Sequence, residues 1–198
     1  MFQNLGLFTA SCNTAIGSGS AKCTTTGCQN TAVGQGALTA NTTGEYNTAV
    51  GRNALGAQNF TTATDSNNTA VGRAALQNNT FGVYNTAVGR TSMQLNTTGK
   101  YNSAFGYSSL KNNTVGTNNN AFGYTALYSN TIGTNNCAFG YQSMYANTTG
   151  ENNAALGVNA LQKNTTGKNN SAFGQGTLTS NTTGSSNSAF GINALHKN

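Results

Sequence analysis

Apolar and small residues return at fixed places every 17 residues along almost the whole chain. Each repeat opens with Asn-x-Ala, an apolar residue and Gly, where x is most often Thr or Ser and the apolar residue most often Val or Phe. After the first repeat, it continues through a small residue and Leu or Met, and it often closes with Asn-Thr-Thr-Gly. The glycine of the opening phrase occurs eleven times, and nine of its ten spacings are 17 residues and one is 21. Repetition at a short fixed period indicates an array of stacked units. The eleven glycines are Gly17, Gly34, Gly51, Gly72, Gly89, Gly106, Gly123, Gly140, Gly157, Gly174 and Gly191.

Each repeat contains two stretches that are compatible with short β-strands. These are Asn-Thr-Ala-Val-Gly and Ala-Leu-x-x-Asn, and Asn-Thr-Thr-Gly supplies a turn whose glycine tolerates a positive φ. Seventeen residues are too few for a helix pair, and proline, which cannot donate to a neighbouring strand, is absent. We therefore predict an all-β fold, a parallel β-solenoid (β-roll) of about eleven 17-residue rungs stacked at ~4.8 Å.

In such a stack, equivalent residues of successive rungs form columns along the axis. We expect the asparagine that recurs in every opening phrase to form an internal amide ladder, in preference to a ligand site. In two sample rungs the expected structural ladder comprises Asn47, Ala49, Val50, Gly51, Asn102, Ala104, Phe105 and Gly106.

Neighbouring residues on a strand point to opposite faces, so Ala49 and Val50 cannot both face the interior of the rung. If both columns need burial, one lies inside the rung and the other against another surface. This predicts lateral self-association, with three chains around an axis as the leading arrangement. The alternative is that the small alanine lies exposed at no cost.

The chain divides into two parts by this pattern. Residues 1–12 are expected to form an N-terminal cap or joining segment, and residues 13–198 the repeat array. The four extra residues near 58–67 should bulge as a loop. Because the array stops at Asn198 within a repeat, we expect either that it belongs to a longer polypeptide or that rods join end to end through their open strand edges.

Composition and charge narrow the possible partners. Only 36% of the residues are apolar, which suits a thin core along an axis. The net charge is +6, but the nine cations are spread at about one per repeat without a basic cluster, so nucleic acid is not an expected partner. No run of ~18 apolar residues exists, and membrane insertion is not expected.

Residues for catalysis or metal binding are scarce. The single histidine is His196, two residues from the end. Glu45 and Glu151 lie about six rungs apart, and Asp65 is in the insertion. No acid–base pair, activated nucleophile or metal cluster can be assembled from them. We therefore expect no enzyme activity and no cofactor.

Two further features are candidates for a specific role. Cys12 and Cys28 are 16 residues apart, which places them on consecutive rungs within reach of a disulfide, and Cys23 is the rival partner. Tyrosines follow the repeat glycine in three successive rungs and form a candidate binding stripe for sugars or a receptor, although tyrosines packing on each other explain it equally well. The stripe comprises Tyr107, Tyr124 and Tyr141.

The repeat phrase resembles those of two related groups. Asn47–Gly51 and Asn102–Gly106 are similar to the phrase in the head repeats of trimeric autotransporter adhesins, which fold as parallel β-rolls. The Asn164-Thr165-Thr166-Gly167 turn makes the chain more similar still to arrays in tail-fibre-like proteins of phages and giant viruses and in large bacterial surface proteins. The resemblance covers roughly residues 13 to 198. It implies an extracellular, cell-surface or virion fibre, homotrimeric and used for attachment to a host receptor or glycan.

The alternative function is ice binding or another form of surface binding by the solenoid. A row of threonines in the closing turn could order water if it were flat. Its members are Thr42, Thr97, Thr148, Thr165 and Thr182.

Overall fold

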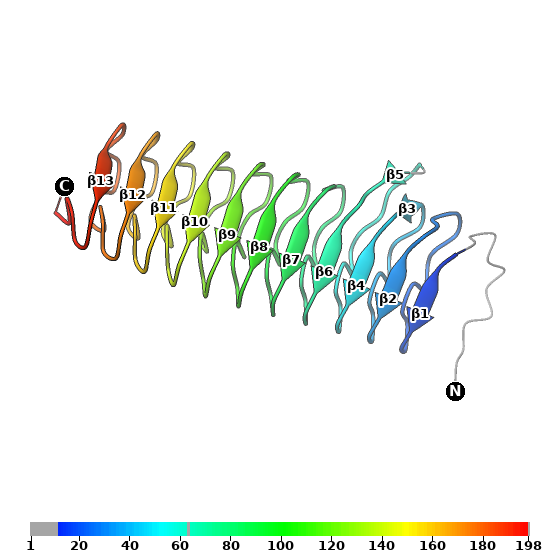
Figure 1. Ribbon diagram of the computed structural model, residues 1–198. Helices are drawn as coiled ribbons and strands as arrows, with labels where there is room; N and C mark the ends of the chain where they lie inside the picture. The colour runs from blue at the N-terminus through cyan, green and yellow to red at the C-terminus, as the bar shows by residue number, and fades with distance from the viewer. Residues whose placement is uncertain (1–11, 63, 198) are drawn as a thin grey trace.

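The computed structural model describes residues 12–62 and 64–197, which form a single row of stacked rungs (Figure 1). The predicted cap at 1–12 lies outside the described residues apart from Cys12. Within the described ranges all regular elements are short β-strands. They are β1 (Thr14–Ile16), β2 (Thr31–Val33), β3 (Gly44–Glu45), β4 (Thr48–Val50), β5 (Thr64–Asp65), β6 (Thr69–Val71), β7 (Thr86–Val88), β8 (Ser103–Phe105), β9 (Asn120–Phe122), β10 (Cys137–Phe139), β11 (Ala154–Leu156), β12 (Ser171–Phe173) and β13 (Ser188–Phe190).

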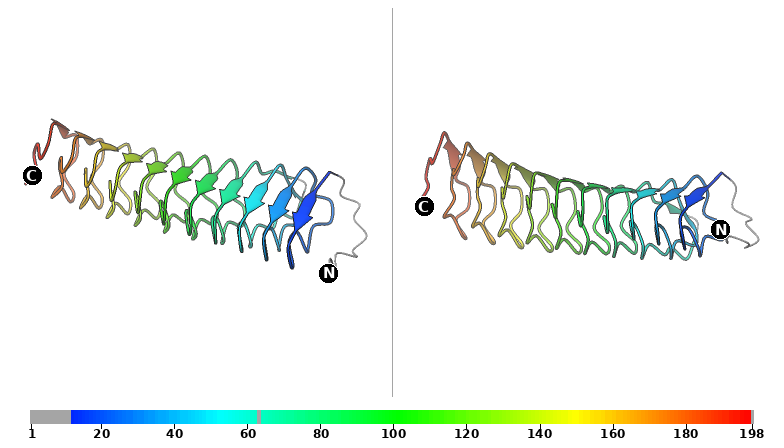
Figure 2. Two further views of the ribbon diagram at one scale, coloured as in Figure 1. Left: turned by 60° about the horizontal axis from the view of Figure 1, so that its bottom comes forward. Right: turned by 90° about the horizontal axis from the view of Figure 1, so that it is seen from below.

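Eleven of these strands form one parallel sheet that runs the length of the rod. Its order is β1-β2-β4-β6-β7-β8-β9-β10-β11-β12-β13, so each strand pairs with the strand of the next rung. The register places equivalent positions of successive repeats opposite each other, as where Ala87 of β7 pairs with Ala104 of β8. Two further views show the same elongated stack (Figure 2). The prediction of an all-β parallel solenoid with 17-residue rungs is confirmed.

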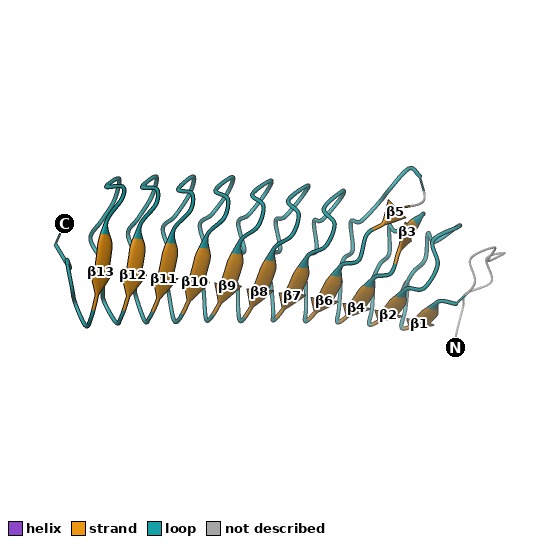
Figure 3. Ribbon diagram, turned by 45° about the horizontal axis from the view of Figure 1, so that its top comes forward, coloured by secondary structure: helices purple, strands orange, loops and turns teal. Residues whose placement is uncertain are grey.

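Each regular rung has one strand, whereas the sequence predicted two. The Ala-Leu-x-x-Asn stretch forms turns (Figure 3), because residues two and four places after the repeat glycine adopt left-handed conformations. In one rung these are Asn53 with φ 58° and Leu55 with φ 49°. The turns still bond to the next rung: the Leu55 N–H donates to the Ala75 carbonyl at 3.1 Å. The second side of the solenoid is therefore hydrogen-bonded without being a regular sheet.

The interior is thin and made of two apolar columns. The alanine column (Ala32, Ala49 and their equivalents) points inward from the sheet, and the leucine column (Leu38, Leu55 and equivalents, with Met93 and Met144) faces it. Ala49 and Ala104 are fully buried, so the alternative of an exposed alanine is wrong. The neighbouring residue of each strand consequently points outward.

The two glycines of each repeat are required for different reasons. The repeat glycine needs a positive φ: Gly51 has φ 130°, and a Cβ there would lie 2.6 Å from the Gly72 carbonyl oxygen. The turn glycine could tolerate a positive φ but does not adopt one in the described rungs. At Gly99 a side chain is excluded by space alone, since a Cβ would lie 2.5 Å from the Gly116 carbonyl oxygen.

The 21-residue rung departs from the regular outline. Its extra residues allow β5 to pair with β3, with Glu45 opposite Asp65, and the segment between β4 and β6 extends beyond the other rungs (Figure 3). Phe60 is buried in this rung, and its ring meets that of Phe81 edge to face with centroids 6.0 Å apart.

Candidate functional site

The asparagines that open the repeats from Asn30 to Asn170 are buried in the interior of the rod. Asn102 is fully buried; its side-chain oxygen accepts from the Asn119 backbone N–H at 2.9 Å, and its amide donates to the Gly116 carbonyl at 2.9 Å. A second buried ladder runs through the closing turn, where Asn96 Nδ2 donates to Asn79 Oδ1 at 2.7 Å. Because these amides are used within the stack, they are structural and present no atoms to a ligand.

The tyrosine stripe lies along one edge of the rod. Tyr107, Tyr124 and Tyr141 stack with ring centroids 5.1 and 5.5 Å apart and interplanar angles of 13° and 11°. Each ring is 41–49% exposed. Since stacking covers the ring faces, the stripe offers mainly ring edges and hydroxyl groups to solvent.

Three arginines continue the tyrosine stripe toward the N-terminus. Arg52, Arg73 and Arg90 occupy the same position of the three preceding rungs and are exposed. The guanidinium carbon of Arg90 lies 5.6 Å from the centre of the Tyr107 ring, which joins the two groups through a cation–π contact. We call this set of six the arginine–tyrosine edge: Arg52, Arg73, Arg90, Tyr107, Tyr124 and Tyr141.

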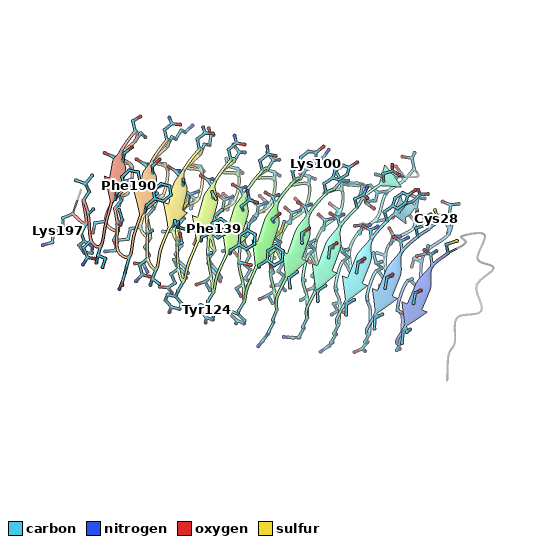
Figure 4. The ribbon with its side chains drawn as sticks, in the orientation of Figure 1. Cys28, Lys100, Tyr124, Phe139, Phe190 and Lys197 are labelled. Carbon is cyan, nitrogen blue, oxygen red and sulfur yellow. The ribbon has the colours of Figure 1, made fainter. Side chains whose placement is uncertain are left out.

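The carboxylates lie away from the arginine–tyrosine edge. Glu45 and Glu151 occupy the position that Lys100 has in its own rung, and Figure 4 shows Lys100 at the edge opposite Tyr124. In the described part of the chain the one ion pair joins Lys168 to Glu151, at 3.2 Å. The three arginines are therefore stacked without a neutralising carboxylate.

Outward-facing apolar side chains cover the sheet. We call them the outer apolar column; Phe139 and Phe190 mark it in Figure 4. Phe105, Phe122 and Phe139 stack with centroids 4.7 and 4.5 Å apart, and Phe190 remains 69% exposed. The column comprises Ile16, Val33, Val50, Val71, Val88, Phe105, Phe122, Phe139, Leu156, Phe173 and Phe190.

In the threonine row of the closing turn, four of the five hydroxyl groups donate hydrogen bonds within the stack. Thr97 Oγ1 donates to the Thr114 carbonyl at 3.0 Å, and Thr148 and Thr165 repeat the bond at 3.1 and 3.0 Å. Thr42 Oγ1 likewise donates to the Phe60 carbonyl at 2.6 Å. The row that sequence reasoning selected for water binding thus stabilises the stack.

The candidate disulfide residues are unpaired. Cys12, Cys23 and Cys28 have free thiols. Burial, followed by the charge of Glu45 and a side-chain hydrogen bond with it, raises the pKa of the Cys28 thiol. Cys137 is also free, and burial raises the pKa of its thiol. A Cys12–Cys28 bridge stays a prediction.

Two tyrosine stacks were not anticipated from the sequence. Tyr84 stacks on Tyr101 at 5.2 Å and Tyr128 on Tyr145 at 5.1 Å. Lys111 lies 5.6 Å from the centre of the Tyr128 ring, repeating the cation-then-tyrosine order of the edge. Their signal was identical aromatic residues at a spacing of 17.

The described ranges contain neither a metal-binding cluster nor a membrane-spanning helix. There, no three or more His, Cys, Asp or Glu side chains gather as a metal site. Nor does any helix in those ranges have the length and apolarity needed to span a bilayer.

Comparison of the chain with protein-family models, with curated proteins and with solved structures finds no match.

Proposed function

We propose that the protein is a structural β-solenoid that assembles laterally with copies of itself into an extracellular or virion-surface fibre used for attachment. The observation that carries the proposal is the outer apolar column. Ile16, Leu156 and Phe190 are 52%, 49% and 69% exposed, and the other eight members of the column are each half-buried. With ten spacings of ~4.8 Å the column is about 48 Å long. Continuous apolar surface of such length is typical of an interface.

The period of the column favours a second copy of the chain as its partner. One apolar side chain projects every ~4.8 Å, and a surface with the same period fits it at every rung. Another copy supplies that period by construction, and identical patches related by rotational symmetry close into a dimer or trimer. Three chains around an axis, with the outer apolar columns facing inward, remains the proposed arrangement.

The mass in solution tests the assembly. Sedimentation and negative-stain images should give a trimer or longer fibre for the wild-type chain. The variant Phe105→Ser/Phe122→Ser/Phe139→Ser should dissociate to monomers. The matched control Tyr107→Ser/Tyr124→Ser/Tyr141→Ser changes three stacked aromatics of the same rungs on a different edge, and it should retain the wild-type mass. A monomeric wild-type rod contradicts the proposal.

Ice binding is the second candidate, and one observation favours a different row for it. On the sheet face Thr31, Thr48, Thr69 and Thr86 each precede an outward-facing valine by two residues, so their side chains point to the same outer face. Regular Thr-x-Val pairs on a parallel sheet could order water. Thermal hysteresis of the wild-type protein that is lost in Thr48→Leu/Thr69→Leu would establish this function, and its absence at micromolar concentration would end it.

A further inference from the structure

The arginine–tyrosine edge repeats a charge that nothing in the described chain neutralises. Like charges on directly opposite residues of neighbouring strands destabilise a sheet, and Arg52, Arg73 and Arg90 follow one another on adjacent rungs. The chain has three carboxylate side chains, those of Glu45, Asp65 and Glu151. Glu45 and Asp65 lie opposite each other on the paired strands β3 and β5, at the other edge of the rod. A ligand that brings regularly spaced anionic groups would relieve this repulsion.

The geometry points to an extended ligand parallel to the rod axis. The six residues of the edge occupy consecutive rungs, and five spacings of ~4.8 Å give a site about 24 Å long. Guanidinium groups bind carboxylates and sulfates through two parallel hydrogen bonds. The tyrosine hydroxyls beyond them can both donate and accept, which suits sugar hydroxyl groups.

Because the faces of the tyrosine rings are covered, they favour a polysaccharide over a nucleic acid as the ligand. Single-stranded nucleic acid is held by aromatic faces on which bases stack. Here Tyr124 has a ring on each side, at 5.1 and 5.5 Å, so its faces are not available to a base. Hydroxyl groups and ring edges remain, and these favour a sugar polymer.

We infer that the arginine–tyrosine edge binds a carboxylated or sulfated polysaccharide lying along the rod, with its anionic groups on Arg52, Arg73 and Arg90 and neutral sugar hydroxyls on Tyr107, Tyr124 and Tyr141. This inference rests on the proposed attachment function and specifies the class of its ligand. A linear polysaccharide advances by roughly one rung per sugar, so affinity should rise with length up to about six sugars and then level off.

Binding is tested with four labelled probes and the full-length protein: polygalacturonate, dextran sulfate, neutral dextran and single-stranded oligo(dT). We expect the first two to bind and both complexes to weaken as salt is raised. Neutral dextran and oligo(dT) should bind at least about tenfold more weakly. Equal or tighter binding of oligo(dT) or of dextran, or no binding of either acidic polymer, overturns the inference.

Variants separate the edge from overall charge. Arg52→Gln/Arg73→Gln/Arg90→Gln should lower affinity for the acidic polymers at least about tenfold, since each guanidinium–anion bond is worth a large part of that factor. The control Lys100→Gln/Lys163→Gln/Lys168→Gln removes the same charge elsewhere and should bind within about twofold of wild type. An equal loss in the control overturns the inference. If the triple arginine-to-glutamine variant does not fold, Arg52→Lys/Arg73→Lys/Arg90→Lys replaces it. Lysine keeps the charge but cannot form two parallel hydrogen bonds to one anionic group, so binding should still weaken.

Mass measured on the same samples keeps the two proposals apart. The arginine variant should assemble like wild type, because the edge is not the outer apolar column. A monomeric chain that still binds acidic polysaccharide through the arginines would contradict the assembly and keep the ligand assignment. A fibre that assembles but does not bind the acidic polymers would contradict the ligand assignment and keep the assembly.

Discussion

Residues 47–101 and 102–152 are adjacent blocks of three repeats each, with one interior and two different exteriors. In the first block the outer apolar column is Val50, Val71 and Val88 and the edge is arginine; in the second they are phenylalanine and tyrosine. The change occurs in both columns between the same two rungs. Yet Ala87 pairs with Ala104 across the boundary in unbroken register.

This comparison separates the residues that build the rod from those that distinguish its surfaces. Asparagine, alanine, leucine and glycine columns continue through both blocks because each contacts its own equivalent in the next rung. Outward positions have no such restriction and change in groups of three, since stacked rings and stacked valines each pack best on their own kind. Function is therefore to be sought where the columns change.

Glycine substitution should have the largest effect and should be equal in the two blocks. Gly72→Ala and Gly140→Ala place a Cβ 2.5 Å from the carbonyl oxygen of the next repeat glycine, at φ values of 131° and 132°. Clash and backbone strain should together lower the free energy of unfolding by about 4 kcal/mol or more in urea titrations. The control Gly56→Ala, whose nearest contact would be 3.4 Å, should change little. Unequal losses in the two blocks would show that the backbones differ.

Removing one interior amide should cost somewhat less. Asn85→Ala and Asn119→Ala each leave the backbone N–H of the next asparagine buried without a partner. Each also removes one of the two amide donors to a turn carbonyl, since Asn96 and Asn130 keep their bonds to Gly99 and Gly133. About 3 kcal/mol of unfolding free energy should be lost in each case, measured by urea titration. Exposed Asn78, replaced by alanine, serves as the control and should be close to neutral. If Asn85→Ala were much milder than Asn119→Ala, the ladder would not be uniform.

The period and the columns could be derived from the sequence, because eleven copies of the repeat show which positions keep the same type of residue. The inward alanine and outward valine follow from alternation on one strand, and the asparagine ladder from identical side chains at strand spacing. The polar interior was thus recognisable although Asn is normally a surface residue.

The second side of each rung could not be derived in this way. Leu55 and Met93 adopt φ values of 49° and 50°, a conformation that costs an ordinary L-residue about 1–2 kcal/mol, so their pattern suggested a strand. Burial of the side chain and the hydrogen bond to the next rung offset this cost. The role of the turn glycine was missed for a related reason, since the lack of space at Gly99 depends on the neighbouring rung and not on its own dihedrals.

On the arginine–tyrosine edge, substitution should lower the free energy of unfolding in the tyrosine block and raise it in the arginine block. Tyr124→Ala removes two stacking contacts and should lower the free energy of unfolding by about 1–2 kcal/mol. The measurement is urea unfolding at high salt, where charge effects are small. Tyr46, which is 45% exposed, is the control, and Tyr46→Ala should cost less than half as much. A similar loss at both sites would mean that stacking along the edge contributes nothing beyond burial.

The smallest effect is expected at the middle arginine. Arg73 lies between Arg52 and Arg90. Arg73→Gln removes its charge repulsion with both neighbours and should raise the free energy of unfolding by less than about 0.5 kcal/mol at low salt. The gain should disappear at 1 M salt, where the screening length is about 3 Å. Adding polygalacturonate should reverse the order and stabilise the wild type over the variant, because ligand bound to the folded state adds stability in proportion to its affinity. Stabilisation of both proteins to the same extent would place the polymer away from Arg73. A loss of stability at low salt would mean that the arginines support the fold and are not held against their own repulsion.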